Sequence, residues 1–221
     1  MFISKVEVDW VKACNPYDLH RAVWNLFPQS DHEVRKNFDE SRSGFLFRIE
    51  ESSPGRPYLL LVQSQLEPQP RGSFIRLIGC REFDPNPSIG QRLSFLLTAN
   101  PIKTISDTQV SSKPEKKSNK KNKFKCRVPL IKEEHQRAWL FRKFNGMAEI
   151  EFVSIEQHSP MFFYRKAKKK DERNSHGKLL TVTFQGVLRV MDPVRLKKVL
   201  QDGLGPAKGF GCGLMLVKKK R

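Results

Sequence analysis

The sequence predicts an α+β protein made of two tandem ferredoxin-like (RNA-recognition-module-like) β-α-β-β-α-β domains. Two observations carry the prediction: the order of strand and helix patterns in the first half, and the return of that order in the second half. The length of 221 residues suits one large domain or two small ones. Prolines and a glycine at 85–90 indicate the joint. We therefore expect an N-terminal domain over residues 1–88 and a C-terminal domain over 89–221.

The first half begins with alternating apolar residues along Ile3–Trp10, which is typical of a strand. Asn15 then provides an N-cap and Pro16 a first helical residue, and the helix should end near Pro28. Three strands are expected to follow, at Gly44–Glu51, Pro57–Gln65 and Phe74–Phe83. The place of the second helix, 66–73, is short and rich in proline and glycine, so the sequence predicts a poor helix there.

The second half gives the same order of patterns. A helix is expected over Lys132–Phe144, with Ala138, Trp139, Phe141 and Phe144 among its charges. A second helix over Val194–Asp202 is capped by Asp192 and Pro193. The expected strands are Arg92–Asn100, Glu149–Ile155, Leu179–Val190 and Leu214–Val217.

The charge of the chain indicates a polyanionic partner. Forty-one Lys and Arg residues stand against 23 Asp and Glu residues, which gives a formal net charge of +18. Charge of this size favours nucleic acid as the partner. An anionic membrane surface is the rival, but no stretch approaches the roughly 20 apolar residues of a spanning helix. Lys5, Glu7 and Asp9 also interrupt any N-terminal secretory pattern, so we expect no membrane association.

The cysteines and histidines do not form a metal-binding pattern. The four cysteines are dispersed, without a C-x-x-C pair, and are expected to be reduced thiols in a cytoplasmic protein. The five histidines also lack the spacing of metal ligands. We therefore expect neither a metal ion nor a small-molecule cofactor.

A glycine-rich segment near the C-terminus, Gly203–Gly213, holds five of the 13 glycines. Successive unhindered N–H groups in such a segment form a concave anion site, to which Lys208 would add a cation. The alternative is a tight turn between a helix and a strand, which needs only one or two glycines. The spacing differs from that of the common nucleotide-binding loops, so a phosphate backbone is the better candidate ligand.

Two lysine-rich segments differ in their expected surroundings. Ser111–Lys125 contains seven lysines and should be a solvated, mobile loop, with its contact to nucleic acid left open. Arg165–Arg173 contains six basic and two acidic residues and lies at the tip of an expected hairpin over 160–178. A hairpin would hold these charges in place, which favours a functional basic finger over a merely solvated tip.

The first helix presents a possible reaction centre. At about 100° per residue, Leu19, Val23 and Leu26 form the core stripe, while four other side chains share the opposite stripe and should point away from the core. These four are Tyr17, His20, Arg21 and Trp24. A lone histidine is more often structural than catalytic. A phenol, an imidazole and a guanidinium together, however, suit metal-free RNA cleavage, in which the 2′-hydroxyl loses a proton and the leaving 5′-oxygen gains one.

Four segments together resemble one known family. In residues and in order, Asn15–Pro28, Ala99–Thr104, Cys126–Glu133 and Gly203–Gly213 are similar to the CasE family of CRISPR-associated endoribonucleases, which mature guide RNA for the Cascade surveillance complex. The resemblance implies two ferredoxin-like domains and metal-independent cleavage at the base of the repeat stem-loop in the CRISPR precursor transcript. It also implies products with 2′,3′-cyclic phosphate and 5′-hydroxyl ends, retention of the product hairpin, and assembly with other Cascade subunits.

The resemblance also implies roles for single residues. His20 takes the place of the catalytic histidine and Tyr17 that of its associated tyrosine. The residues implied in RNA binding are Arg21, Asn100, Lys103, Arg165, Lys166, Lys168, Lys169, Lys170, Gly205, Lys208, Gly209 and Gly211. The insertion at 111–125 looks longer and more basic than the family pattern.

Two alternatives remain open from the sequence. A non-catalytic RNA-hairpin-binding subunit fits the charge, the glycine-rich segment and the fold, but it needs no exposed imidazole at His20. A general basic assembly protein explains the charge but not the four matching segments.

Overall fold

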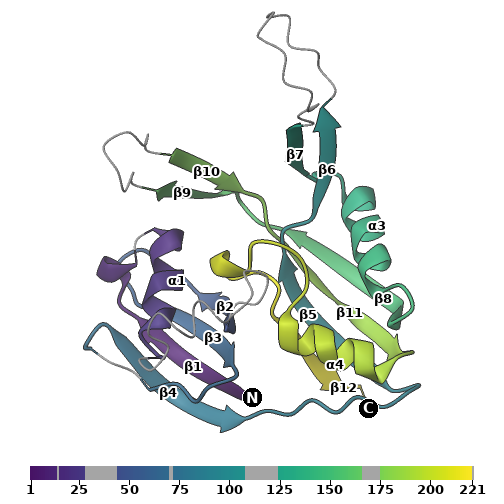
Figure 1. Ribbon diagram of the computed structural model, residues 1–221, viewed down its shortest axis with the longest axis horizontal. Coiled ribbons are helices and arrows are strands. Elements are labelled where there is room, and N and C mark those ends of the chain that lie inside the picture. Colours follow the sequence, from purple (N-terminus) through teal and green to yellow (C-terminus); the bar gives the residue numbers. More distant parts are fainter. Residues whose placement is uncertain (14, 28–43, 70–71, 108–123, 166–174, 221) are drawn as a thin grey trace, which may run out of the picture.

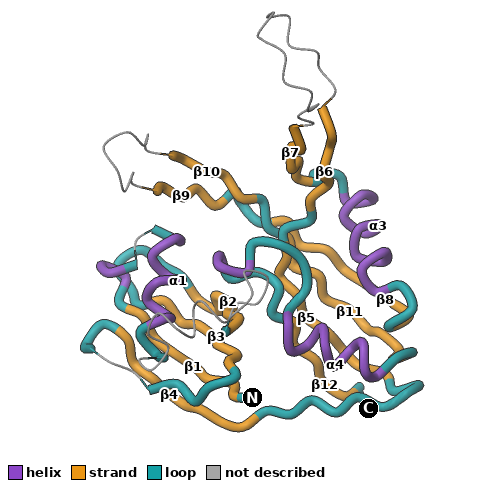
Figure 2. The backbone as a smooth tube through the Cα atoms, viewed as in Figure 1, coloured by secondary structure: helices purple, strands orange, loops and turns teal. Residues whose placement is uncertain are grey.

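The structure, a computed structural model, describes residues 1–13, 15–27, 44–69, 72–107, 124–165 and 175–220. Two four-stranded antiparallel sheets and two two-stranded hairpins make up its β structure (Figure 1). The predicted α+β class with tandem ferredoxin-like units is confirmed. The division at residue 88 remains a prediction; it falls in the irregular stretch that joins the two sheets (Figure 2).

The N-terminal sheet has the strand order β2-β3-β1-β4. Its strands are β1 (Phe2–Val8), β2 (Phe45–Glu51), β3 (Tyr58–Ser64) and β4 (Ile75–Glu82). A short 3₁₀ turn, η1 (Trp10–Lys12), leads into helix α1 (Pro16–Trp24), which packs on one face of the sheet. In the described part of the β3–β4 connection no helix occurs, as the poor pattern at 66–73 predicts.

The C-terminal sheet repeats this topology in the order β12-β5-β11-β8. Its strands are β5 (Arg92–Ala99), β8 (Ala148–Gln157), β11 (Val182–Val190) and β12 (Met215–Lys219). Helices α3 (Glu133–Phe144) and α4 (Pro193–Asp202) lie on one face of the sheet (Figure 1). In both units the first strand lies between the third and the fourth, which is the ferredoxin-like arrangement.

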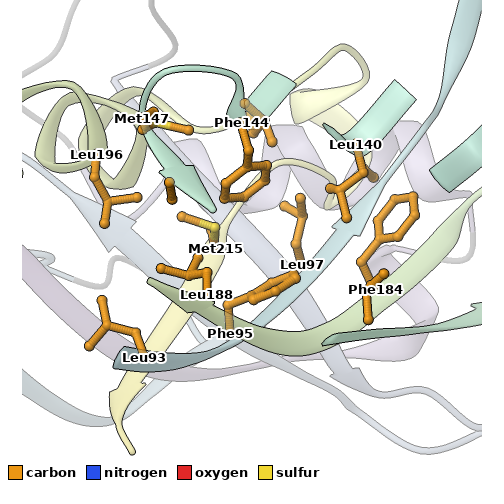
Figure 3. Packing of buried hydrophobic residues seen from close by; sticks show 14 of the residues in the cluster. Leu93, Phe95, Leu97, Leu140, Phe144, Met147, Phe184, Leu188, Leu196 and Met215 are labelled. Atoms are coloured by element: carbon orange, nitrogen blue, oxygen red, sulfur yellow. The ribbon is translucent and has the colours of Figure 1, made fainter. Parts of the chain in front are cut away.

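Each unit has its own hydrophobic core. In the C-terminal unit, Phe95, Phe144 and Phe184 pack with aliphatic side chains from α3, α4 and β12 (Figure 3). In the N-terminal unit the stripe predicted on α1 is confirmed, since Leu19 and Val23 are buried against the sheet.

Two hairpins extend the C-terminal unit. The first, β6 (Ile102–Asp107) with β7 (Phe124–Pro129), was not predicted, and β7 takes in the last two residues of the loop expected at 111–125. Ile105 and Val128 are both exposed, and no residue of β6 or β7 whose burial is described is more than partly buried, so these residues show no core periodicity. The remainder of that loop, 111–123, lies outside the described residues.

The second hairpin pairs β9 (Met161–Arg165) with β10 (Ser175–Leu179), where a basic hairpin is predicted over 160–178; its tip lies outside the described residues. The strand predicted over 179–190 is wrong at its start, because Leu179 ends β10 and β11 begins at Val182. The Asn100 amide donates to the carbonyl of Leu180 at 2.6 Å, which holds the chain between the two strands.

Polar contacts join the two units directly. The Gln63 amide on β3 donates to the carbonyl of Leu200 on α4 at 2.8 Å. Arg48 on β2 donates to the Thr98 hydroxyl on β5 at 3.1 Å. The chain after α4 runs close to β2, where Gly203 lies near Leu46 and Gly211 near Phe47, so the glycine-rich segment lies at the junction of the two units.

Candidate active site

Three elements meet at this junction: the start of α1, the hairpin strand β9, and the short 3₁₀ turn η2 (Lys208–Phe210) of the glycine-rich segment. Phe210 lies between the other two elements. Its ring centroid is 4.6 Å from that of Phe163 on β9 and 6.3 Å from that of Tyr17 on α1. Tyr17 is therefore held by the C-terminal unit as well as by its own helix.

His20 does not point away from the core as the helical stripe predicts. Its half-buried ring lies 5.1 Å from the Phe45 ring and 6.4 Å from the Phe47 ring, centroid to centroid, and both phenylalanines belong to β2. The stripe prediction considers α1 alone, whereas the rings of these two β2 residues contact the imidazole. His20 thus lies at the edge of the N-terminal core, beside the C-terminal unit.

Trp24 fixes the form of the imidazole. Its indole Nε1 donates a hydrogen bond of 3.1 Å to Nε2 of His20, one helical turn earlier. An indole N–H can only donate, so Nε2 must be the accepting nitrogen and the proton must be on Nδ1. The sequence analysis placed Trp24 on the stripe without giving it a role. Its position four residues after His20 was the signal that the two side chains could be in contact.

The glycine-rich segment covers the Nδ1 side of the ring. Nδ1 is buried, and a β-carbon on Gly209 would lie 3.5 Å from it. Gly209 has no positive φ angle and would meet no tight contact, so neither backbone conformation nor crowding within the protein explains a glycine there. A β-carbon at Gly209 would lie in ordinary van der Waals contact with the His20 ring.

The backbone conformation of the turn explains the other glycines of the segment. Gly203, Gly205, Gly211 and Gly213 all have positive φ angles, between 75° and 92°. These angles favour glycine because it has no β-carbon. The alternative interpretation as a tight turn therefore accounts for four of the five glycines, which leaves Gly209 apart.

Lys208 is directed to α4. Its Nζ donates to the carbonyl of Asp202, at the end of that helix, at 2.6 Å, a favourable place for a cation. Burial lowers the pKa of Lys208, and the charge of Asp202 opposes this effect in part. In the free protein this amine fastens the glycine-rich segment to α4.

The remaining site residues of the sequence prediction are scattered. Arg21 is exposed, with a 3.5 Å ion pair to Asp18, and Lys103 is exposed on β6. Asn100 is buried and holds the β10–β11 connection. The structure thus brings Tyr17 and His20 to the glycine-rich segment but not Asn100. Of the finger residues, Arg165 ends β9, while Lys166, Lys168, Lys169 and Lys170 lie outside the described residues.

Cysteine, metal and membrane features add little to the site. Burial raises the pKa of the Cys212 thiol, within the glycine-rich segment, to about 12. Among the described residues, no group of three or more His, Cys, Asp or Glu side chains could hold a metal ion. Over the same part of the chain, the helices are too short or too polar to cross a bilayer.

The fold and the junction define a class of protein: paired ferredoxin-like units with a histidine of the first unit beneath a glycine-rich segment of the second. A family model described as CRISPR associated protein matches residues 1–219. The chain belongs to this family.

Two curated relatives match nearly the whole chain. The CRISPR system Cascade subunit CasE of Escherichia coli K12 is 35% identical over 215 residues, which cover 97% of this chain and 98% of the relative. The CRISPR-associated endoribonuclease Cse3 of Thermus thermophilus is 31% identical, over 92% of this chain and 90% of its own.

Two solved structures are similar throughout. The crystal structure of Cas6e from E. coli K-12 matches with a TM-score of 0.77 at 34% identity and covers 100% of both chains. A structure of the CRISPR endoribonuclease Cse3 bound to a 19-nucleotide RNA matches with a TM-score of 0.70 at 26% identity and covers 99% of this chain and 100% of that one.

Proposed function

We propose that this protein is a metal-independent endoribonuclease that cleaves the CRISPR precursor transcript at the base of the repeat stem-loop. It stays bound to the product hairpin and acts as a subunit of the Cascade complex. The observation that carries the proposal is the position of His20, at the junction of two ferredoxin-like units in a chain of net charge +18. The names of the relatives support both the RNA-cleaving activity and the complex.

The chemistry needs two proton transfers and charge stabilisation. The ribose 2′-hydroxyl loses its proton and attacks the adjacent phosphorus, the bond from phosphorus to the 5′-oxygen breaks, and that oxygen gains a proton. The products are a 2′,3′-cyclic phosphate and a 5′-hydroxyl. The imidazole of His20 can serve as base or acid near neutral pH, and nearby cations stabilise the phosphorane. Tyr17 orients the ribose or the transferred proton.

Access to His20 requires a rearrangement at the junction. Nδ1 is buried under the glycine-rich segment, and Nε2 accepts the hydrogen bond from Trp24. RNA must therefore displace either η2 or the indole before a ribose can reach a nitrogen of the ring. The backbone N–H groups around Gly209 would then meet a phosphate, as expected for a glycine-rich anion site.

Recognition of the stem is assigned to the hairpin β9–β10 and the basic residues between its strands. The deep, narrow major groove of A-form RNA is hard for side chains to read, so phosphate contacts and the shape of the stem should dominate. An RNA stem held by this hairpin, which contacts α1 directly, would place its base near His20.

Incubation of the protein with its cognate repeat RNA in excess EDTA tests the proposal. Cleavage should proceed without metal, leave the two expected ends, and stop when the 2′-hydroxyl at the scissile nucleotide is replaced by hydrogen. A strict magnesium requirement, or cleavage of the deoxy substrate, would refute the mechanism. Tight binding without cleavage would favour the non-catalytic RNA-binding subunit instead.

A further inference from the structure

Asn15 connects α1 to the basic hairpin through a paired hydrogen bond. Its amide Nδ2 donates to the carbonyl of Tyr164 on β9 at 2.5 Å, and its Oδ1 accepts from the backbone N–H of the same residue at 3.3 Å. The two residues are 149 positions apart in the sequence. A side-chain amide here pairs with a strand backbone much as a neighbouring strand would.

The same amide also caps α1, but less closely. Oδ1 accepts from the N–H of Tyr17 at 3.4 Å, which is long for a hydrogen bond of this kind. A cap alone could be made by serine, threonine or aspartate. Among the common N-cap side chains, only asparagine has a donor nitrogen separate from its acceptor oxygen, so the paired contact with Tyr164 distinguishes its side chain.

The neighbouring residues reinforce this connection. Phe163, immediately before Tyr164, packs on Phe210 of η2 at 4.6 Å between ring centroids. Phe210 in turn contacts Tyr17, two residues after Asn15. Beyond Tyr164, β9 continues to Arg165, where the basic finger begins. One short stretch of chain therefore links the finger to the helix that carries His20.

We propose that Asn15 is a positioning residue that locks the β9–β10 hairpin to α1, so that RNA held by the hairpin meets His20 in one fixed register. This inference rests on the function proposed above. Asn15 does not contact the reacting atoms; it sets the offset between the element that binds the stem and the element that cleaves it. Without this link, the hairpin can shift along α1, and the phosphate presented to His20 varies.

Three substitutions separate the two contacts of Asn15. Asn15→Ser keeps an oxygen for the helix cap and removes the amide donor. Asn15→Asp keeps the cap and the shape but turns a carboxylate oxygen towards the Tyr164 carbonyl. Asn15→Ala removes both contacts. The measurements are single-turnover cleavage of the repeat RNA with mapping of the cut position, RNA affinity, and amide hydrogen exchange of the free protein.

All three variants should cleave about tenfold more slowly than the wild type, the scale of one lost hydrogen bond. They should also cut at neighbouring phosphodiester bonds, with nearly unchanged RNA affinity. In Asn15→Ser, the amide of Tyr164 should exchange faster while the amides of α1 keep their protection.

The outcomes separate failure of the role proposed for Asn15 from failure of the proposed endoribonuclease function. Wild-type rate and cut position in Asn15→Ser and Asn15→Asp would overturn the inference, whether or not Asn15→Ala is impaired, because the effect would then belong to the helix cap. Unchanged exchange at Tyr164 in Asn15→Ser would overturn it independently of activity. Failure of the wild-type protein to cleave the RNA would instead refute the proposed function.

Discussion

The indole of Trp24 donates a 3.1 Å hydrogen bond to Nε2 of His20, and this contact sets which imidazole nitrogen carries the proton. Trp24→Phe keeps an aromatic ring against Phe45, 5.0 Å away in the wild type, but removes the donor. We expect the ¹⁵N NMR spectrum of the free protein to move from the Nδ1–H tautomer towards a mixture of tautomers. Single-turnover cleavage should fall severalfold with RNA affinity nearly unchanged. An unchanged tautomer in the variant would contradict the assigned role of Trp24.

Gly209 and Gly205 form a matched pair within one segment. Gly209→Ala should leave the melting temperature nearly unchanged, because its φ angle is not positive and its nearest contact would be 3.5 Å. It should slow cleavage, because the methyl group takes up room beside His20.

Gly205→Ala should do the opposite. Its φ angle of 85° and a contact of 3.2 Å with Trp139 should cost stability, since an L side chain in the left-handed region costs about 1–2 kcal/mol. Thermal unfolding and single-turnover kinetics separate the two effects. Equal loss of stability in both variants would refute the distinction.

Lys208 gives the stability of the protein a pH dependence. Because burial lowers its pKa in the folded state, the unfolded chain binds more protons between the folded and the unfolded pKa. The cost of burying the charge is present at low pH and is relieved as the pH rises through the folded pKa. Relative to Lys208→Met, the wild type should therefore gain stability as the pH rises towards 10.5, the ordinary pKa of a lysine. Urea unfolding of both proteins at each pH measures this difference, and a constant difference would contradict it.

The basic hairpin and the lysine-rich insertion should contribute unequally to RNA binding. Combined replacement of Arg165, Lys166, Lys168, Lys169 and Lys170 by neutral residues should weaken hairpin binding strongly and flatten its salt dependence. Each lost phosphate contact lowers the slope of log K against log salt by roughly 0.9 for duplex DNA, and we expect a similar order for an RNA stem.

Deletion of 112–123 should cost far less affinity. The finger follows β9, which Asn15 and Phe163 join to the site, whereas the insertion follows β6. Titrations at several salt concentrations compare the two variants. Equal losses would place the insertion in the RNA site.

Local sequence signals predicted most of the fold. The Asn-Pro and Asp-Pro pairs placed the starts of α1 and α4 correctly, and the Asp192 carboxylate accepts from the N–H of Arg195 at 3.0 Å as a cap should. The hairpin β6–β7 escaped prediction because its apolar residues Ile105 and Val128 are exposed and give no pattern of a buried face. Periodicity reports burial, so a strand without a core leaves little signal.

The sequence could predict which site residues lie together within one segment, but not which segments meet in the fold. Helical spacing put Tyr17, His20 and Trp24 on one stripe, but it could not show which other elements meet that stripe. The position of Gly209 over His20 depends on how the two units dock, and docking leaves no local pattern. The pairing of Asn15 with Tyr164, 149 residues apart, was invisible to the sequence for the same reason.

Single-turnover cleavage and RNA binding by His20→Ala test the central claim most directly. General acid–base assistance is worth about 10²–10⁴ in rate, so cleavage of the repeat RNA should fall by that factor. The dissociation constant should change little, because one imidazole adds little to phosphate binding. His135→Ala, an exposed histidine on α3, is the matched control and should cleave like the wild type. Wild-type cleavage by His20→Ala, or a loss of binding equal to the loss of cleavage, would contradict the account.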